Sequence, residues 1–273
     1  MASLREMKKR LKSIETTGQL AGAMRTAATA KYARLGSARD TFSPYADACR
    51  DMLCALGGAG LPRRTEEIRE RDCVVILSGN RGMCGGFHAE LFRFLDNAMP
   101  GFDEPLLLAC GRKAAQRLRE RGVGFEEYAV ADVPGFDEIK SLARRIRELY
   151  ETGQAARVFV VYQRFKNMLT QEPAAIRLLP EEDPVSGEER TPLLYLPDRD
   201  TIAAQLAGSC FDARMYELAL ENALGAQAAT LMAMRSACDN ANEAAEELSV
   251  AIHRRRQAEV TSGVIETASG NYQ

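Results

Sequence analysis

The chain has 273 residues, a length that suggests one or two domains, and 46% of them are apolar, an ordinary share for a soluble globular protein. A formal net charge of −2 does not indicate a nucleic-acid-binding protein, and no apolar run approaches the roughly 18 residues of a membrane-spanning helix. Seven cysteines without a CxxC pair, beside two histidines, exclude a zinc cluster of usual spacing and suit a reducing cytoplasm.

The first 56 residues predict one long helix, which begins without the apolar region of a signal peptide. Apolar or small residues recur at steps of three and four, interrupted by Arg25 and Arg39, and so form a heptad seam. The Gly- and Pro-rich stretch at residues 57–62 ends the helix, and a charged linker follows it. The seam consists of Leu4, Met7, Leu11, Ile14, Gly18, Ala21, Ala28, Tyr32, Leu35 and Phe42.

Basic side chains are concentrated in this first helix. Residues 1–34 contain eight basic and two acidic side chains. The pattern is typical of a solvated helix face, and the alternative is a strip that meets an acidic or polar partner.

The middle of the chain, residues 73–197, predicts a separate α/β domain. Short β-branched and apolar runs alternate with amphipathic segments, as in a parallel sheet covered by helices. We expect an exposed loop at residues 180–192, because that stretch is acidic and rich in proline. The expected strands are residues 73–77, 106–110, 158–162, 174–179 and 193–196, and the expected helices are residues 86–98, 112–121 and 136–150.

A second long helix is predicted from about residue 201 to near the end, with 203–273 as its domain. At about 65 residues, or roughly 100 Å, it is too long for the small sheet to cover. The two terminal helices can best bury their seams against each other, and we expect them to be antiparallel. The predicted fold is therefore α/β: a long antiparallel coiled coil of N- and C-terminal helices plus a central Rossmann-like domain. The second seam consists of Leu220, Leu224, Gln227, Leu231, Met234, Cys238, Ala241, Ala245, Leu248 and Ile252.

The segment at residues 78–86 is the most enzyme-like part of the chain. It is Gly-rich and connects a strand to a helix, where a phosphate-binding loop would lie. It lacks the Gly-Lys-Ser/Thr ending of a P-loop and the GxGxxG order of a dinucleotide site, so a tight turn is favoured over nucleotide binding. Cys84 and His88 could pair as nucleophile and base, but no third orienting residue is evident. We expect no catalytic, cofactor-binding or metal-binding residues.

Three blocks of sequence carry a family resemblance. The first block is residues 1–14, continued by Thr16 to Leu20 and by residues 23–31. The second is residues 81–87, Arg-Gly-Met-Cys-Gly-Gly-Phe. The third is residues 232–241, continued by Arg256-Gln257-Ala258 and Val260-Thr261. In this order and spread over the whole chain, they resemble the gamma chain of F-type ATP synthases.

The resemblance implies a central rotor stalk with no small-molecule substrate, cofactor or nucleic acid of its own. The paired helices would stand in a ring of three alpha and three beta subunits, and the α/β domain beside the epsilon subunit on the c-ring. Rotation would couple ion flow to ATP synthesis or hydrolysis at the cytoplasmic face of the cell membrane, to which the chain would be peripheral. Arg256 and Gln257 match family positions that meet the beta subunits, and Lys8, Lys9, Arg10 and Met24 are suspected shaft contacts.

The C-terminal end departs from the family pattern. Thr261-Ser262-Gly263 replaces the usual Thr-x-Glu, and Ser269-Gly270-Asn271 replaces the usual Gly-Gly-Ala. A divergent gamma paralogue of a sodium-pumping ATPase is one alternative. A nucleotide-binding α/β enzyme with a coiled-coil oligomerisation arm is another, and a homodimeric coiled-coil adaptor is a third.

Overall fold

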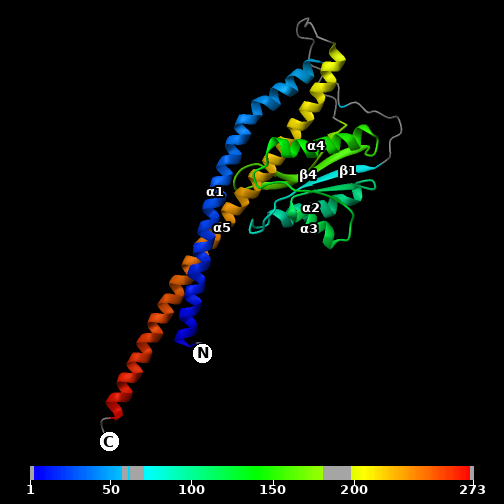
Figure 1. The fold of residues 1–273 in the computed structure, drawn as a ribbon. Helices are drawn as coiled ribbons and strands as arrows, with labels where there is room; N and C mark the ends of the chain where they lie inside the picture. The colour runs from blue at the N-terminus through cyan, green and yellow to red at the C-terminus, as the bar shows by residue number, and fades with distance from the viewer. Residues whose placement is uncertain (1–2, 57–60, 62–70, 181–197, 271–273) are drawn as a thin grey trace. The chain divides into compact units, whose positions relative to one another are not determined.

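A computed structural model describes residues 3–56, 61, 71–180 and 198–270, with side chains up to residue 265. Its contacts divide the chain into two compact units, one formed by residues 1–28 with 231–273 and the other by residues 29–230. Both units contain parts of the two long helices, α1 (Leu4–Ala55) and α5 (Arg199–Gly270), which Figure 1 draws in blue and in yellow to red.

The first unit pairs the start of α1 with the last part of α5. A Cβ atom added to Gly18 would lie 3.2 Å from the Cβ of Ala241, and one added to Gly22 would lie 4.0 Å from the sulfur of Cys238. Residue numbers rise along one helix while they fall along the other, so the pair is antiparallel, as predicted. Small side chains at the seam allow this close approach.

The second unit contains a five-stranded sheet in the order β3-β2-β1-β4-β5. The first four strands are parallel, and β5 pairs with β4 in the antiparallel direction. The strands are β1 (Asp72–Leu77), β2 (Leu106–Cys110), β3 (Glu126–Tyr128), β4 (Arg157–Phe165) and β5 (Gln171–Leu179). The direction of the chain order reverses between β1 and β4, which is where doubly wound domains bind their ligands.

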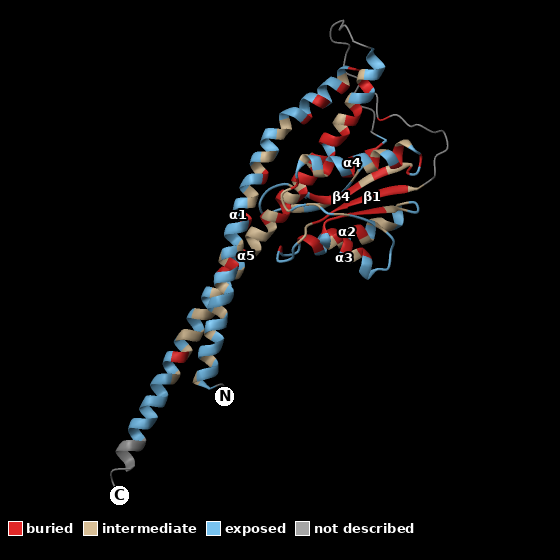
Figure 2. Ribbon diagram, viewed as in Figure 1, coloured by how far each residue is buried: buried red, intermediate tan, exposed pale blue. Residues whose placement is uncertain are grey.

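Helices cover both faces of this sheet. Figure 1 shows α2 (Phe87–Ala98) and α3 (Arg112–Glu120) on one face and α4 (Phe136–Glu151) on the other; a short 3₁₀ helix, Met99–Gly101, follows α2. Val74 and Ile76 of β1 pack with α2 and α3, whereas Cys73, Val75 and Leu77 pack with α4. Because both faces are covered, β1 is buried along its whole length, as the red strands of Figure 2 show.

The C-terminal part of α1 and the N-terminal part of α5 contribute to the core of the α/β unit. Leu35 of α1 and Phe211, Met215, Leu220 and Leu224 of α5 are buried in the same cluster as the sheet residues. The expectation that the two helices bury their seams mainly against each other therefore needs correction over residues 29–55 and 199–230. Leu220 and Leu224 are heptad positions, but their apolar partners include the sheet.

The helices and strands expected within the described residues are present, with ends shifted by a few residues. Strand β3 was not expected from the sequence, because its three residues, Glu-Glu-Tyr, look like an exposed charged segment. Glu126 is instead fixed by Arg145 of α4 at 2.8 Å, and this hydrogen bond lowers the pKa of Glu126. The loop and strand expected at residues 180–192 and 193–196 lie outside the described residues, apart from Pro180.

Candidate functional site

The Gly-rich turn after β1 is tied to its surroundings by protein groups. Asn80 accepts a hydrogen bond from the Arg112 amide at 3.1 Å and donates one to the Val130 carbonyl at 2.6 Å. The Ser78 hydroxyl accepts from the Ala114 amide and donates to the Cys110 carbonyl, both at 2.9 Å. The turn is thus held to the first amides of α3, the helix that follows the neighbouring strand β2.

Cys84 and His88 do not form an activated nucleophile and base. Both side chains are buried, and burial raises the pKa of the Cys84 thiol while it lowers the pKa of His88. At neutral pH these shifts favour the neutral thiol and the neutral imidazole, the opposite of a thiolate–imidazolium pair. His88 Nε2 is also engaged with the Arg81 carbonyl at 3.0 Å.

The crevice at the carboxyl ends of β1 and β4 is filled by α5. A cavity of about 30 Å³ remains between the turn at Ser78 to Asn80 and the α5 residues Asn222 to Gln227. It has room for about one or two water molecules but not for a nucleotide. The rival hypothesis of a nucleotide-binding enzyme placed its pocket around residues 79–86, and this side of the turn offers no such space.

A wider, open hollow of about 490 Å³ lies on the other side of the turn, at the ends of β1, β2 and β3. Its carboxylates already have partners. Asp132 pairs with Lys31 of α1 at 2.5 Å, and Glu138 accepts hydrogen bonds from the Ala131 and Gly135 amides at 2.9 and 3.3 Å. Burial alone would raise the pKa of Asp132, but hydrogen bonds from Lys31 and Asn80 hold it below its usual value. These carboxylates connect elements of the fold and do not form a general acid–base pair.

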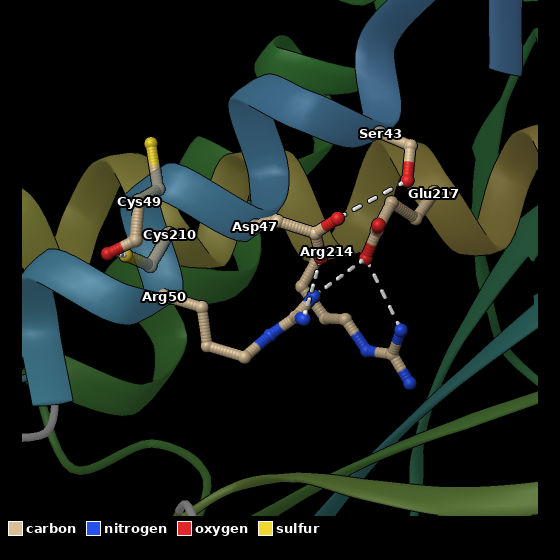
Figure 3. A network of polar contacts seen from close by, with 7 residues as sticks. All are labelled: Ser43, Asp47, Cys49, Arg50, Cys210, Arg214 and Glu217. Atoms are coloured by element: carbon tan, nitrogen blue, oxygen red, sulfur yellow. Dashed lines mark hydrogen bonds and ion pairs between the residues drawn. The ribbon is translucent and has the colours of Figure 1, made fainter. Parts of the chain in front are cut away.

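Polar contacts also connect α1 with α5 inside the α/β unit. Figure 3 shows Arg50 of α1 reaching Glu217 of α5 at 3.4 Å, while Arg214 reaches the same carboxylate at 3.2 Å. The Cys210 thiol donates to the carbonyl of Cys49 at 3.0 Å. At the ends of the two helices, Arg199 donates to the Leu56 carbonyl at 2.9 Å. The C-terminal end of α1 and the N-terminal end of α5 are thus held to each other within this unit.

The contact residues expected from the sequence lie in the first unit, which is formed by residues 1–28 and 231–273. Lys8, Lys9 and Arg10 are exposed on α1, and no ion pair is formed by them within the described residues. Arg256 and Gln257 are likewise exposed on α5. Met24 differs, since it is partly buried against the cluster of Ala21, Met234 and Cys238.

The described part of the chain contains no candidate membrane span or metal site. None of the described helices combines the length and the apolar character that crossing a bilayer requires. Over the same residues, no group of three or more His, Cys, Asp or Glu side chains could hold a metal ion.

Sequence comparison identifies the family. A family model described as ATP synthase matches residues 3–272. ATP synthase gamma chains from Desulforamulus reducens and Rubrobacter xylanophilus are each 31% identical to this chain, over 99% of its length and 98% of theirs. The chain belongs to the ATP synthase gamma chain family. A gamma chain from Gluconobacter oxydans is also 31% identical, over 99% of both chains.

Solved structures agree with this gamma chain assignment at the level of the fold. A chain of the Euglena gracilis mitochondrial ATP synthase rotor has a TM-score of 0.67 and 17% identity, over 94% of this chain and 98% of that one. A chain of the Tetrahymena thermophila central stalk and c-ring has a TM-score of 0.60 and 15% identity, over 80% and 99%. The predicted fold class, long terminal helices with a central α/β sheet, is confirmed.

Family membership gives the chain the role of the gamma subunit of an ATP synthase, a membrane-associated complex. The sequence analysis did not single out Asp132, Gln163 or Asn222, because their role depends on contacts between elements far apart in the chain.

Proposed function

We propose that this chain is the rotating central stalk of an F-type ATP synthase and is not itself catalytic. The observation that carries the proposal is the 31% identity to gamma chains along 99% of the chain. The filled crevice and the neutral Cys84–His88 pair support the absence of chemistry of its own. Rotation of an asymmetric shaft would bias the conformations of the surrounding catalytic sites through differential contacts.

The partners of the proposed stalk are a ring of three alpha and three beta subunits, the epsilon subunit and the c-ring. Solved relatives of this fold come from mitochondrial ATP synthase structures described as the rotor and as the central stalk with the c-ring. We propose that residues 1–57 and 203–273 form the shaft and residues 73–197 the foot. Through these partners the chain would lie peripherally at the cytoplasmic face of the cell membrane.

Five exposed side chains are proposed contacts of the shaft. Arg256 and Gln257 would meet the beta subunits, where a guanidinium can make directional, bidentate hydrogen bonds. Lys8, Lys9 and Arg10 would meet polar or acidic groups of the ring, since their charges are exposed. Met24, being partly buried, would act mainly by packing the two helix ends together.

Co-purification tests the proposed function. An affinity-tagged copy of the chain, expressed with the alpha and beta subunits of its own organism, should bring them down in a 1:3:3 ratio. Recovery as a homodimer without those subunits would favour the adaptor hypothesis. Calorimetry of the isolated chain with ATP should show no binding heat, and saturable binding would favour the enzyme hypothesis.

A further inference from the structure

Strand β4 extends beyond the strand beside it. The last paired residues of β1 and β4 are Ile76 and Val161, whereas β4 continues to Phe165. On the other side, Gln163 stands opposite Pro173 of β5. The end of β4 thus presents amides on the side where β1 has already ended.

Two side chains of α5 take the place of the missing strand. The Asn222 side-chain oxygen accepts a hydrogen bond from the Gln163 amide at 3.2 Å. The Glu221 carboxylate accepts one from the Phe165 amide at 3.0 Å. Gln163 is fully buried, and its side chain donates to the Phe87 carbonyl at the start of α2 at 2.7 Å. One turn of α5 therefore completes the hydrogen bonding of the sheet end.

The same turn of α5 fits closely against the sheet at Gly225. A Cβ atom at this position would lie 3.2 Å from the ring of Phe87 and 3.3 Å from Cγ of Gln171. Both distances are tighter than ordinary van der Waals contact, so a larger residue fits only if these side chains or the helix shift by a few tenths of an ångström. We call Glu221, Asn222 and Gly225 the α5 key.

A second polar contact holds α5 about 15 Å along the helix from Asn222. Asp212 is buried and pairs with Arg147 of α4 at 3.3 Å. Arg147 can reach it because a Cβ atom on Gly208 would lie only 2.6 Å from the guanidinium. Asp212 and Asn222 are ten residues apart, which is about 15 Å along a helix and about 80° around its axis. Contacts at two heights and two angles oppose both rotation of the helix about its own axis and sliding along it.

Apolar burial alone would specify the helix position less strictly. The hydrophobic contribution is not directional, and an apolar helix face can be reburied after a small rotation or shift. Hydrogen bonds to the strand amides and the close contact at Gly225 are directional and allow one position. A buried amide left without its acceptor makes any other position unfavourable.

We propose that the α5 key positions α5 on the α/β domain so that shaft and foot rotate as one body. The proposal rests on the proposed function and adds to it the residues that connect the two parts. Glu221, Asn222 and Gly225 are positioning residues, since they bind elements of the chain itself. Without the α5 key, part of the rotation of the α/β domain should be lost as movement of α5 relative to that domain.

The test uses the complete complex in lipid vesicles and compares Asn222→Leu with Asn222→Asp. Leucine keeps the volume without the acceptor oxygen, and aspartate keeps the acceptor. We measure ATP hydrolysis and the membrane potential it generates with a voltage-sensitive dye, which reports either a proton or a sodium current. For Asn222→Leu we expect at least a twofold lower potential-generating rate per ATP hydrolysed. Asn222→Asp should retain the wild-type ratio, and so should the control Ser209→Ala, whose hydroxyl donates to the Gln205 carbonyl within α5.

Several outcomes would overturn the proposal. An assembled Asn222→Leu complex with the wild-type ratio would do so, and so would equal losses in the leucine and aspartate variants. If the leucine variant does not assemble, Gly225→Ala is compared with the double variant Gly225→Ala/Phe87→Leu, in which the smaller leucine makes room for the added methyl group. A ratio that falls in the single variant and recovers in the double variant supports the α5 key. A ratio that does not recover contradicts it. A wild-type chain that fails to join the complex would instead contradict the proposed function.

Discussion

Gly111 shows how one residue fixes the connection between β2 and α3. Its φ angle of 91° lies in a region that L-residues rarely adopt, and an added Cβ would lie 2.6 Å from the carbonyl oxygen of Ser78. Ser78 itself bonds to both β2 and α3. The glycine thus permits the close approach of the two turns that connect the sheet to its helices.

Replacing Gly111 with alanine should therefore destabilise the chain by about 3 kcal/mol, from backbone strain and a clash with backbone. Thermal unfolding followed by circular dichroism measures the change. Gly124→Ala is the matched control, because nothing lies within 4 Å of its added Cβ and its φ angle is not positive. Similar losses in the two variants would show that the geometry at Gly111 is not the cause.

The ion pair of Arg147 and Asp212 leads to a prediction that depends on pH. Burial raises the pKa of Asp212, and the charge of Arg147 opposes this rise. With Arg147→Met, the ionised carboxylate is buried without its partner, at a cost of about 3 kcal/mol. Because the pKa of Asp212 in the folded state lies above its unfolded value, protonation relieves this cost as the pH falls through the folded pKa.

The melting temperature of Arg147→Met should accordingly be depressed more strongly at pH 8 than at low pH, where the Asp212 carboxyl is protonated. Lys166→Met serves as a comparison, since Lys166 and Glu172 form an exposed pair at 2.6 Å. Such a surface pair contributes about 1 kcal/mol or less. A loss for Arg147→Met that is the same at both pH values would refute the assigned cause.

At the scale of the elements, the terminal helices depend on small residues at their seam. Ala21, Met234 and Cys238 are buried there, and Gly18 faces Ala241. Every heptad position predicted for α1 and α5 is buried or partly buried, whereas Lys8, Lys9 and Arg10 are exposed. The periodicity therefore identified the inward faces correctly without identifying what each face contacts.

Gly18→Leu should force the paired helix ends apart. Cys238 is 8% exposed, and its sulfur lies 3.7 Å from the Gly18 carbonyl. We expect alkylation of Cys238, followed by mass spectrometry of its peptide, to become several times faster. Gly36→Ala is the control, because its added Cβ meets nothing within 4 Å. Unchanged labelling of Cys238 in the leucine variant would contradict the pairing.

At the scale of the whole molecule, the two compact units predict independent stability. Ending the chain after Ile252 removes Arg256 and Gln257 but leaves residues 29–230 intact. We expect the shortened chain to assemble or couple poorly in the complex, while its α/β unit stays resistant to limited proteolysis. Digestion of that unit as well would contradict the prediction, and full coupling would contradict the proposed role of Arg256 and Gln257.

The sequence by itself determined the long helices, the parallel strands and the family, since these depend on local periodicity and on matched blocks. Only the tertiary structure decided where the helix faces are buried. The heptad positions Leu220 and Leu224 look like the rest of the seam, yet they pack with the sheet. Asn222 and Gln163 are polar residues of ordinary appearance, and they become partners only because β4 extends past β1 beside α5. Such contacts join residues 59 positions apart, and no local pattern records them.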